Sequence, residues 1–82
     1  MTKKEMKERI AREMADTMFC ALFHEKDHND QEMANSLKKR VVGMLDAAKV
    51  LGLKPNEVSG RAWEIYRDIY KPREATLQKA GA

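Results

Sequence analysis

The sequence predicts an all-α fold, a three-helix bundle with two long helices (about 3–25 and 30–51), a third helix (about 56–70) and a short C-terminal tail. Apolar residues recur mostly at spacings of three and four, which places each set on one face of a helix, whereas strands need a spacing of two. Two short polar breaks, near residues 26–30 and 52–55, separate three such sets. In chain order the sets are Met6, Ile10, Met14, Phe19 and Leu22; then Met33, Leu37, Val41, Met44, Ala48 and Leu51; then Val58, Ala62, Ile65 and Ile69.

The first helix begins with the pattern of a capping box. Thr2 is followed three residues later by Glu5, and in this arrangement each side chain accepts a hydrogen bond from the backbone N–H of the other residue. The helical apolar pattern continues to about His24–Lys26. Polar residues at positions 27–30 then interrupt it, so we expect the helix to end there.

The second helix is bounded by a cap and a glycine. Asn29, three residues before Glu32, forms a second pair of this kind and predicts a helix that begins at Asp30. The helix is expected to end at Leu51, because Gly52 follows and glycine readily adopts the left-handed conformation that terminates many helices.

The third helix is expected to begin at Pro55 or Asn56, since the first helical turn does not need the N–H that proline lacks. It should end at Tyr70, because Pro72 cannot continue the helical hydrogen bonds and disfavours helix in the preceding residue. The tail from Arg73 onward adds at most a turn or two. The residues that we expect to be buried between the helices are Leu37, Val41, Leu45, Ile65 and Ile69.

Length and composition predict a single helical domain, residues 1–82. Apolar residues make up 43% and charged residues 35% of the chain, a balance typical of a folded helical protein. A chain this short buries about 60–65% of its unfolded surface, which leaves little room for a deep catalytic cleft. Every apolar run is far shorter than the roughly 20 residues of a membrane span, and the mixed-charge N-terminus lacks a secretory apolar segment. With Cys20 as its single cysteine, we expect a cytoplasmic protein without membrane contacts.

One short pattern points to zinc chemistry. Residues 24–28 (HEKDH) match H-E-x-x-H, in which two histidines one helical turn apart bind zinc and the glutamate acts as general base. They resemble the motif of the zincin metallopeptidases, which implies a zinc-dependent hydrolase. Such sites need a third protein ligand, and this chain has charged residues at the two central positions and no convincing ligand downstream. Cys20, His24 and His28 recur at intervals of four, but a cysteine among apolar residues is most often simply buried. We therefore expect no catalysis, no metal and no cofactor.

Residues 48–59 (AKVLGLKPNEVS) resemble the core of a helix-turn-helix. In that family a small residue before the turn glycine lets two helices pack closely, and apolar residues after it anchor the DNA-binding helix. Ala48, Gly52, Leu53 and Val58 occupy these positions. The resemblance implies a DNA-binding transcriptional regulator, whereas a tight turn between packed helices uses the same residues, so both interpretations stay open. In the first interpretation the DNA-binding residues are Lys54, Asn56, Ser59, Arg61, Arg67 and Lys71.

The chain also carries more apolar and aromatic residues than three narrow stripes require. Trp63, Tyr66 and Tyr70 form a second stripe on the third helix, and Met18 and Phe23 widen the stripe of the first. Tryptophan, tyrosine and methionine are enriched in protein interfaces. We therefore expect a small non-catalytic helical protein that acts through protein–protein interaction, with these five residues as its partner-binding surface. Its size suits an accessory regulator or inhibitor of the type that phages and mobile elements encode. DNA binding is the alternative, and a homodimer through the long helices stays open.

Overall fold

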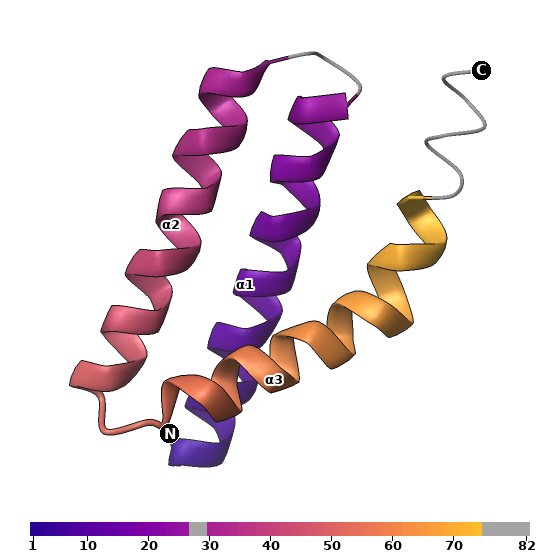
Figure 1. The fold of residues 1–82 in the computed structure, drawn as a ribbon. Helices are drawn as coiled ribbons and strands as arrows, with labels where there is room; N and C mark the ends of the chain where they lie inside the picture. Colours follow the sequence, from indigo (N-terminus) through magenta and orange to yellow (C-terminus); the bar gives the residue numbers. More distant parts are fainter. Residues whose placement is uncertain (27–29, 75–82) are drawn as a thin grey trace.

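The computed structural model describes residues 1–26 and 30–74, and within these ranges the chain forms three helices and no strand (Figure 1). Helices α1 (Lys3–Lys26) and α2 (Gln31–Val50) lie side by side and run antiparallel. The third helix starts near the N-terminus of α1 as α3 (Pro55–Ile65) and continues through the π-helical segment η1 (Tyr66–Tyr70) into a last turn at 71–74. The predicted all-α, three-helix fold is confirmed. None of these helices is both long enough and apolar enough to span a bilayer.

The first two helices begin with side-chain caps. As predicted, Glu5 N donates to Thr2 Oγ1 at 3.1 Å, and Thr2 N donates to Glu5 Oε1 at 3.3 Å. On α2 the cap is Asp30, whose Oδ1 accepts from the backbone N of Met33 at 3.1 Å, so the helix begins one residue later than predicted. An aspartate caps as well as an asparagine, and its negative charge is also favoured by the helix dipole. The expected cap Asn29 lies outside the described residues.

The turn between α2 and α3 closes with a Schellman motif. Gly52 has a φ of +79°, and its N–H donates to Lys49 O at 3.1 Å while Leu53 N–H donates to Ala48 O at 2.9 Å. These two bonds satisfy carbonyls that the end of the helix leaves unpaired, and the positive φ favours glycine. Pro55 follows as the first residue of α3. The predicted break at 52–55 is confirmed.

Pro72 does not end the third helix, contrary to the prediction. The backbone N–H of Lys71 bonds to Tyr66 O, five residues earlier, and the helical turn continues over residues 71–74. In a regular α-helix a proline ring clashes with the carbonyl four residues before it. The wider π turn of η1 gives this ring room, so the chain remains helical through Pro72. The rest of the predicted C-terminal tail, residues 75–82, lies outside the described ranges.

The core lies along α1, at the end of the bundle that contains the α2–α3 turn. Small residues from all three helices meet there, and short side chains let helices approach closely. Met14 and Val58 are the largest fully buried side chains among them. The buried core residues are Ala11, Met14, Ala15, Ala48, Leu53, Val58, Ala62, Ile65 and Tyr66.

The predicted core is partly correct. Leu37 and Ile65 are buried, but Val41 and Leu45 are only half-buried and Ile69 is 44% exposed. Ile69 lies in η1, where the wider turn changes the helical register and so breaks the spacing that placed it beside Ile65. Val41 and Leu45 face a region from which the third helix has already diverged.

An ion pair fastens the third helix to α1. Arg61 donates from Nε to Glu8 Oε2 at 2.7 Å and from Nη2 to Glu8 Oε1 at 2.9 Å. A third bond runs from Arg61 Nη1 to Glu64 Oε2 at 3.1 Å. The bonds from Arg61 hold the pKa of Glu8 at about 2, and the carboxylates raise the pKa of Arg61 above its usual value. This two-bond geometry gives the contact between α3 and α1 a defined orientation.

Replacing Leu37 with alanine tests the packing of α2. Leu37→Ala should lower the free energy of unfolding by about 2–4 kcal/mol, because apolar transfer energy is lost and a cavity forms. The matched control is Val42→Ala on the same helix, where the side chain is 59% exposed; its effect should stay within about 0.5 kcal/mol. Urea unfolding followed by circular dichroism measures both. Equal losses in the two variants would show that the inner face of α2 is misassigned.

The Glu8–Arg61 pair should make stability depend on pH in a defined window. The pKa of the Glu8 carboxyl is about 2 in the folded chain, whereas its ordinary value, which applies to the unfolded chain, is 4.5. Between these two pH values the unfolded state therefore binds more protons than the folded state. The stabilisation from the pair is therefore fully present above pH 4.5 and is lost as the pH falls toward 2. The melting temperature of the wild type should exceed that of Glu8→Gln above this window, and the difference should shrink through it. Glu13→Gln, which removes an exposed carboxylate from the same helix, should show no such loss; a pH-independent difference for Glu8→Gln contradicts the assignment.

Candidate functional site

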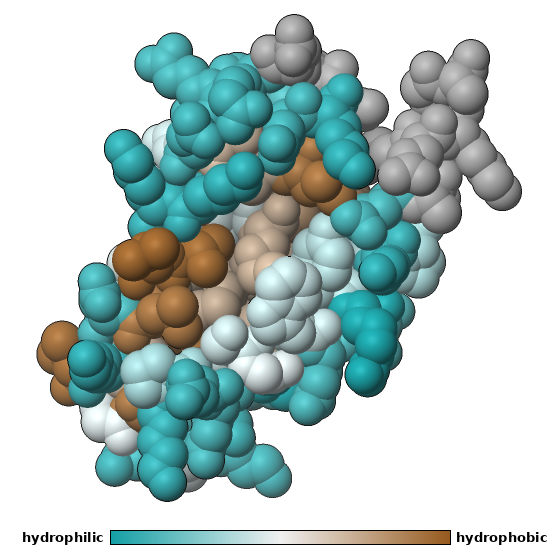
Figure 2. Space-filling view, in the orientation of Figure 1, coloured by the Kyte–Doolittle hydropathy of each residue, from teal (hydrophilic) through white to brown (hydrophobic). Residues whose placement is uncertain are grey.

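An apolar groove of about 600 Å³ opens between α2 and the third helix, with α1 as its floor. Figure 2 shows apolar side chains exposed in the hollow between these helices, bordered by hydrophilic residues. The groove, here called the α2–α3 groove, begins where the two helices diverge beyond the closely packed core. The core on which it borders contains the alanines that bring the three helices together at the turn end.

The floor and one wall of the groove consist of aliphatic and methionine side chains. Met14, Met18 and Leu22 follow one another along α1 at spacings of four, and Val41 and Leu45 do the same along α2. Spacings of four keep these residues in one row on each helix, so both rows face the groove. Methionine side chains are flexible and polarisable, which lets such a floor adapt to different apolar partners.

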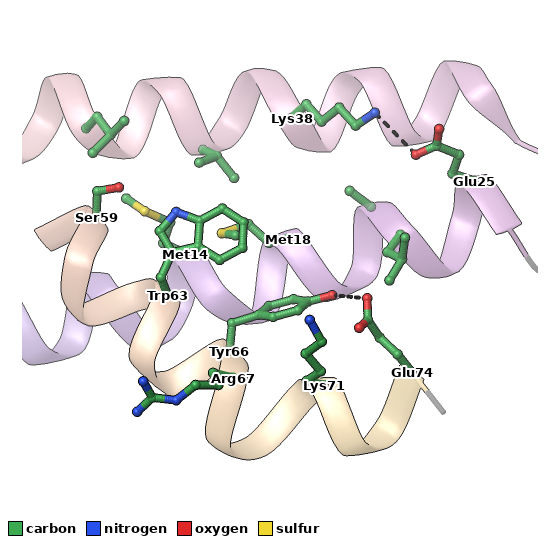
Figure 3. A pocket seen from close by; sticks show the side chains of 14 residues that line it. Met14, Met18, Glu25, Lys38, Ser59, Trp63, Tyr66, Arg67, Lys71 and Glu74 are labelled. Carbon is green, nitrogen blue, oxygen red and sulfur yellow. Dashed lines mark hydrogen bonds and ion pairs between the residues drawn. The ribbon is translucent and has the colours of Figure 1, made fainter. Parts of the chain in front are cut away.

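The opposite wall carries two aromatic rings (Figure 3). Trp63 is 58% exposed, and its ring meets the edge of Tyr66 with the centroids 5.9 Å apart. Tyr66 is itself buried, and its hydroxyl donates to Glu74 Oε1 at 2.7 Å. Burial first, and then the neighbouring Glu74 carboxylate, raise the pKa of Tyr66 well above its usual range, so the phenol remains a donor. Tyr66 is therefore held in place, while most of the indole of Trp63 faces solvent.

Charged side chains lie at the rim. Lys38 Nζ contacts Glu25 Oε2 at 3.2 Å and joins α2 to α1 across one end of the groove. Arg67 pairs with its neighbour Asp68 at 3.0 Å. Lys71 also lines the groove and forms no ion pair within the described part of the chain. The groove therefore combines an apolar interior with a polar edge.

The structure brings together three of the five residues that we expect to contact a protein partner. Met18, Trp63 and Tyr66 line the groove, whereas Phe23 and Tyr70 do not. The ring of Tyr70 packs against Phe19 at a centroid distance of 5.2 Å, and its hydroxyl bonds with Asp16. These contacts place Tyr70 in the interface between α1 and η1. Phe23 is half-buried, with its ring beside that of the adjacent histidine.

Sequence reasoning missed most of the aliphatic lining. The helical spacing places Val41 and Leu45 in the core and Leu22 in a packing stripe, because groove and core residues share the same spacing. Met14 lines the groove and is also a true core residue. The signal that could have indicated the groove was the excess of apolar residues on the first and third helices.

The structure places the six predicted DNA-binding residues in three different surroundings. Lys54 and Asn56 are exposed at the start of α3, but Ser59, Arg67 and Lys71 line the groove. Arg61, expected on a phosphate, instead forms the two-bond ion pair with α1. Its charge is thus already neutralised within the fold.

The metal hypothesis gains no further ligand from the fold. Cys20 is half-buried, and burial, followed by the charge of Asp16, raises the pKa of its thiol, which disfavours the thiolate that binds metals. His28 lies outside the described residues. Within residues 1–26 and 30–74, the fold assembles no group of three or more histidine, cysteine, aspartate or glutamate side chains suited to a metal. That the protein works without metal or cofactor stays a prediction.

Comparison with protein-family models, with curated proteins and with solved structures gives no match. The chemistry and shape of the α2–α3 groove are therefore the basis for assigning a function.

Proposed function

We propose that this chain is a non-catalytic helical binding protein whose α2–α3 groove holds a segment of a partner protein. The supporting observation is an open apolar groove of about 600 Å³ with a tryptophan, Trp63, 58% exposed at its edge. Clefts of roughly 300–1,000 Å³ that are lined mainly by apolar and aromatic side chains are typical of binding sites. Tryptophan is also among the residues that most often contribute the main part of binding energy in interfaces.

The arrangement of the lining supports a protein partner in particular. Protein interfaces combine an apolar, well-packed centre with a polar rim. The apolar lining of this groove includes Met18, Val41 and Leu45. The charged residues Lys38 and Lys71 lie toward its borders (Figure 3). A partner that fills the centre removes these side chains from water, which is the dominant favourable term in association.

Such a protein acts by blocking a segment of its partner. While this segment lies in the groove, it cannot form its other contacts, so the groove-bearing protein works as an accessory regulator or inhibitor. This role requires no catalytic group, in agreement with the expectation from the sequence.

Trp63→Ala tests the groove as a binding site. Peptides that bind the full chain are first selected from a display library, and their affinities are then measured for each variant. Trp63→Ala should weaken binding by at least about tenfold, or about 1.4 kcal/mol, because the variant lacks an aromatic side chain that the bound peptide covers. Val42→Ala, at an exposed position of α2 outside the groove lining, should bind like the wild type. If no peptide is selected, or if Trp63→Ala binds equally well, the proposed function is wrong.

DNA binding is the second candidate function, and the geometry of the α2–α3 turn favours it. Ala48 and Val58 are fully buried on either side of Gly52, as the helix-turn-helix resemblance requires. Lys54 and Asn56 are exposed just beyond the turn, at the start of α3. Glu57 and Glu64 are also exposed on α3, and Arg61 on the same helix is already paired with Glu8. Both features reduce the positive charge that α3 can offer to phosphates.

A duplex titration separates the two candidates. Fluorescence anisotropy with a labelled DNA duplex should show no binding at low salt if the protein acts through the groove alone. A DNA-binding protein instead shows an affinity that falls steeply as salt rises, because counterions are released from the phosphates. Salt-sensitive binding that is lost in Lys54→Ala, while Val42→Ala retains it, would establish DNA binding.

A further inference from the structure

All residues that line the α2–α3 groove belong to helices, and this restricts the conformation of the bound segment. The backbone N–H and C=O groups of helical residues are already paired within their own helix, so they offer few hydrogen bonds to an incoming chain. An extended peptide would leave its own backbone groups unsatisfied against an apolar floor, and there is no sheet edge in the described residues to pair with them. A helix brings a backbone that is already paired.

The dimensions of the groove also suit a helix. On α1 the lining residues extend from Met14 to Glu25, and at 1.5 Å per residue this corresponds to about 16 Å, or roughly three helical turns. Along the third helix the lining extends further, from Ser59 to Glu74. The site lies where a fourth helix would complete the bundle, between α2 and the third helix and above α1 (Figure 3).

The charges at the rim indicate which kind of helix fits. Three cations and two carboxylates line the groove, and both carboxylates already have a hydrogen-bond partner: Glu25 pairs with Lys38, and Glu74 accepts a hydrogen bond from the Tyr66 hydroxyl. Lys71 lines the same wall without an ion pair to any residue of the described ranges, and its ammonium group points toward the groove (Figure 3). Among the charged groups of the lining, Lys71 is therefore the one that has no ion pair or hydrogen bond in the described residues and that a partner can still pair.

The inference from these observations rests on the proposed function and extends it. We infer that the α2–α3 groove binds an amphipathic helix of about three turns from another protein, with apolar residues on its inner face and a carboxylate opposite Lys71. The chain's own residues 75–82 contain one large apolar side chain, Leu77, which is too little to fill the groove. A second copy of the chain remains as an outcome that the experiment can detect.

The experiment uses three synthetic peptides of 15 residues and the full chain. Two peptides share one leucine stripe at helical spacing and carry either glutamates or lysines at the flanking positions. The third is the glutamate peptide with a central proline, which disfavours helix. Binding is followed through the emission of Trp63, the only tryptophan in the sequence. The glutamate peptide should bind at least about threefold more tightly than the lysine peptide at low salt, and the proline peptide should bind at least about tenfold more weakly than its parent.

Charge reversal at the rim provides the second measurement. Lys71→Glu should weaken the glutamate peptide about threefold to tenfold and strengthen the lysine peptide, as expected for one partly exposed charge pair. Lys49→Glu, which makes the same change at an exposed position outside the groove lining, should leave both affinities unchanged.

Each contrary result has a defined meaning. If the glutamate and lysine peptides bind with equal affinity, the inference that the partner is acidic is wrong. If the proline peptide binds as tightly as its parent, the inference that the bound segment is helical is wrong. In both cases the proposal that the groove binds a protein segment stands. If light scattering shows a dimer and dilution shifts the Trp63 emission, a second copy occupies the groove and the inference is wrong. If none of the three peptides binds, the inference fails, and the display selection with Trp63→Ala decides the proposed function separately.

Discussion

The close packing of alanines at the turn end of the bundle determines how the three helices are arranged. Ala11 and Ala15 on α1, Ala48 on α2 and Ala62 on α3 are all fully buried, so three backbones approach one another there. One turn of helix further, the third helix carries Tyr66 in place of a small residue, and it diverges from α2. The bundle is therefore tight at one end and open at the other. The groove lies beyond the point where the third helix diverges from α2.

Features of the fold that depend on neighbouring residues could be predicted from the sequence. The cap formed by Thr2 and Glu5, and the positive φ of Gly52, depend on residues within one helical turn, and both are present. Two predictions are wrong for a common reason: that Ile69 is buried, and that the third helix ends before Pro72. Both predictions assume an uninterrupted α-helical register, whereas the π turn of η1 changes that register and accommodates the proline ring.

The candidate site could be predicted only in part, because helical periodicity reports which residues share a face and not what covers that face. Trp63 and Met18 were identified because they exceed what a narrow stripe needs, and both line the groove. Val41 and Leu45 have the same spacing as true core residues, and only the divergence of the third helix leaves them half-exposed. Tyr70 has equal interface propensity, yet its contacts with α1 remove it from the groove.

Both walls of the groove are fastened to its floor, and this bears on how it binds. The third helix is tied to α1 by Arg61 with Glu8 and by Tyr70 with Asp16, while Lys38 ties α2 to α1. The groove is therefore already open in the unbound chain, before the proposed partner binds. Preorganisation of this kind reduces the conformational entropy lost on association, which otherwise offsets much of the apolar burial. In the proposed complex, conformational entropy is lost mainly by the partner segment and by a few flexible side chains of the lining. A small apolar groove on a short chain can therefore suffice for the proposed binding.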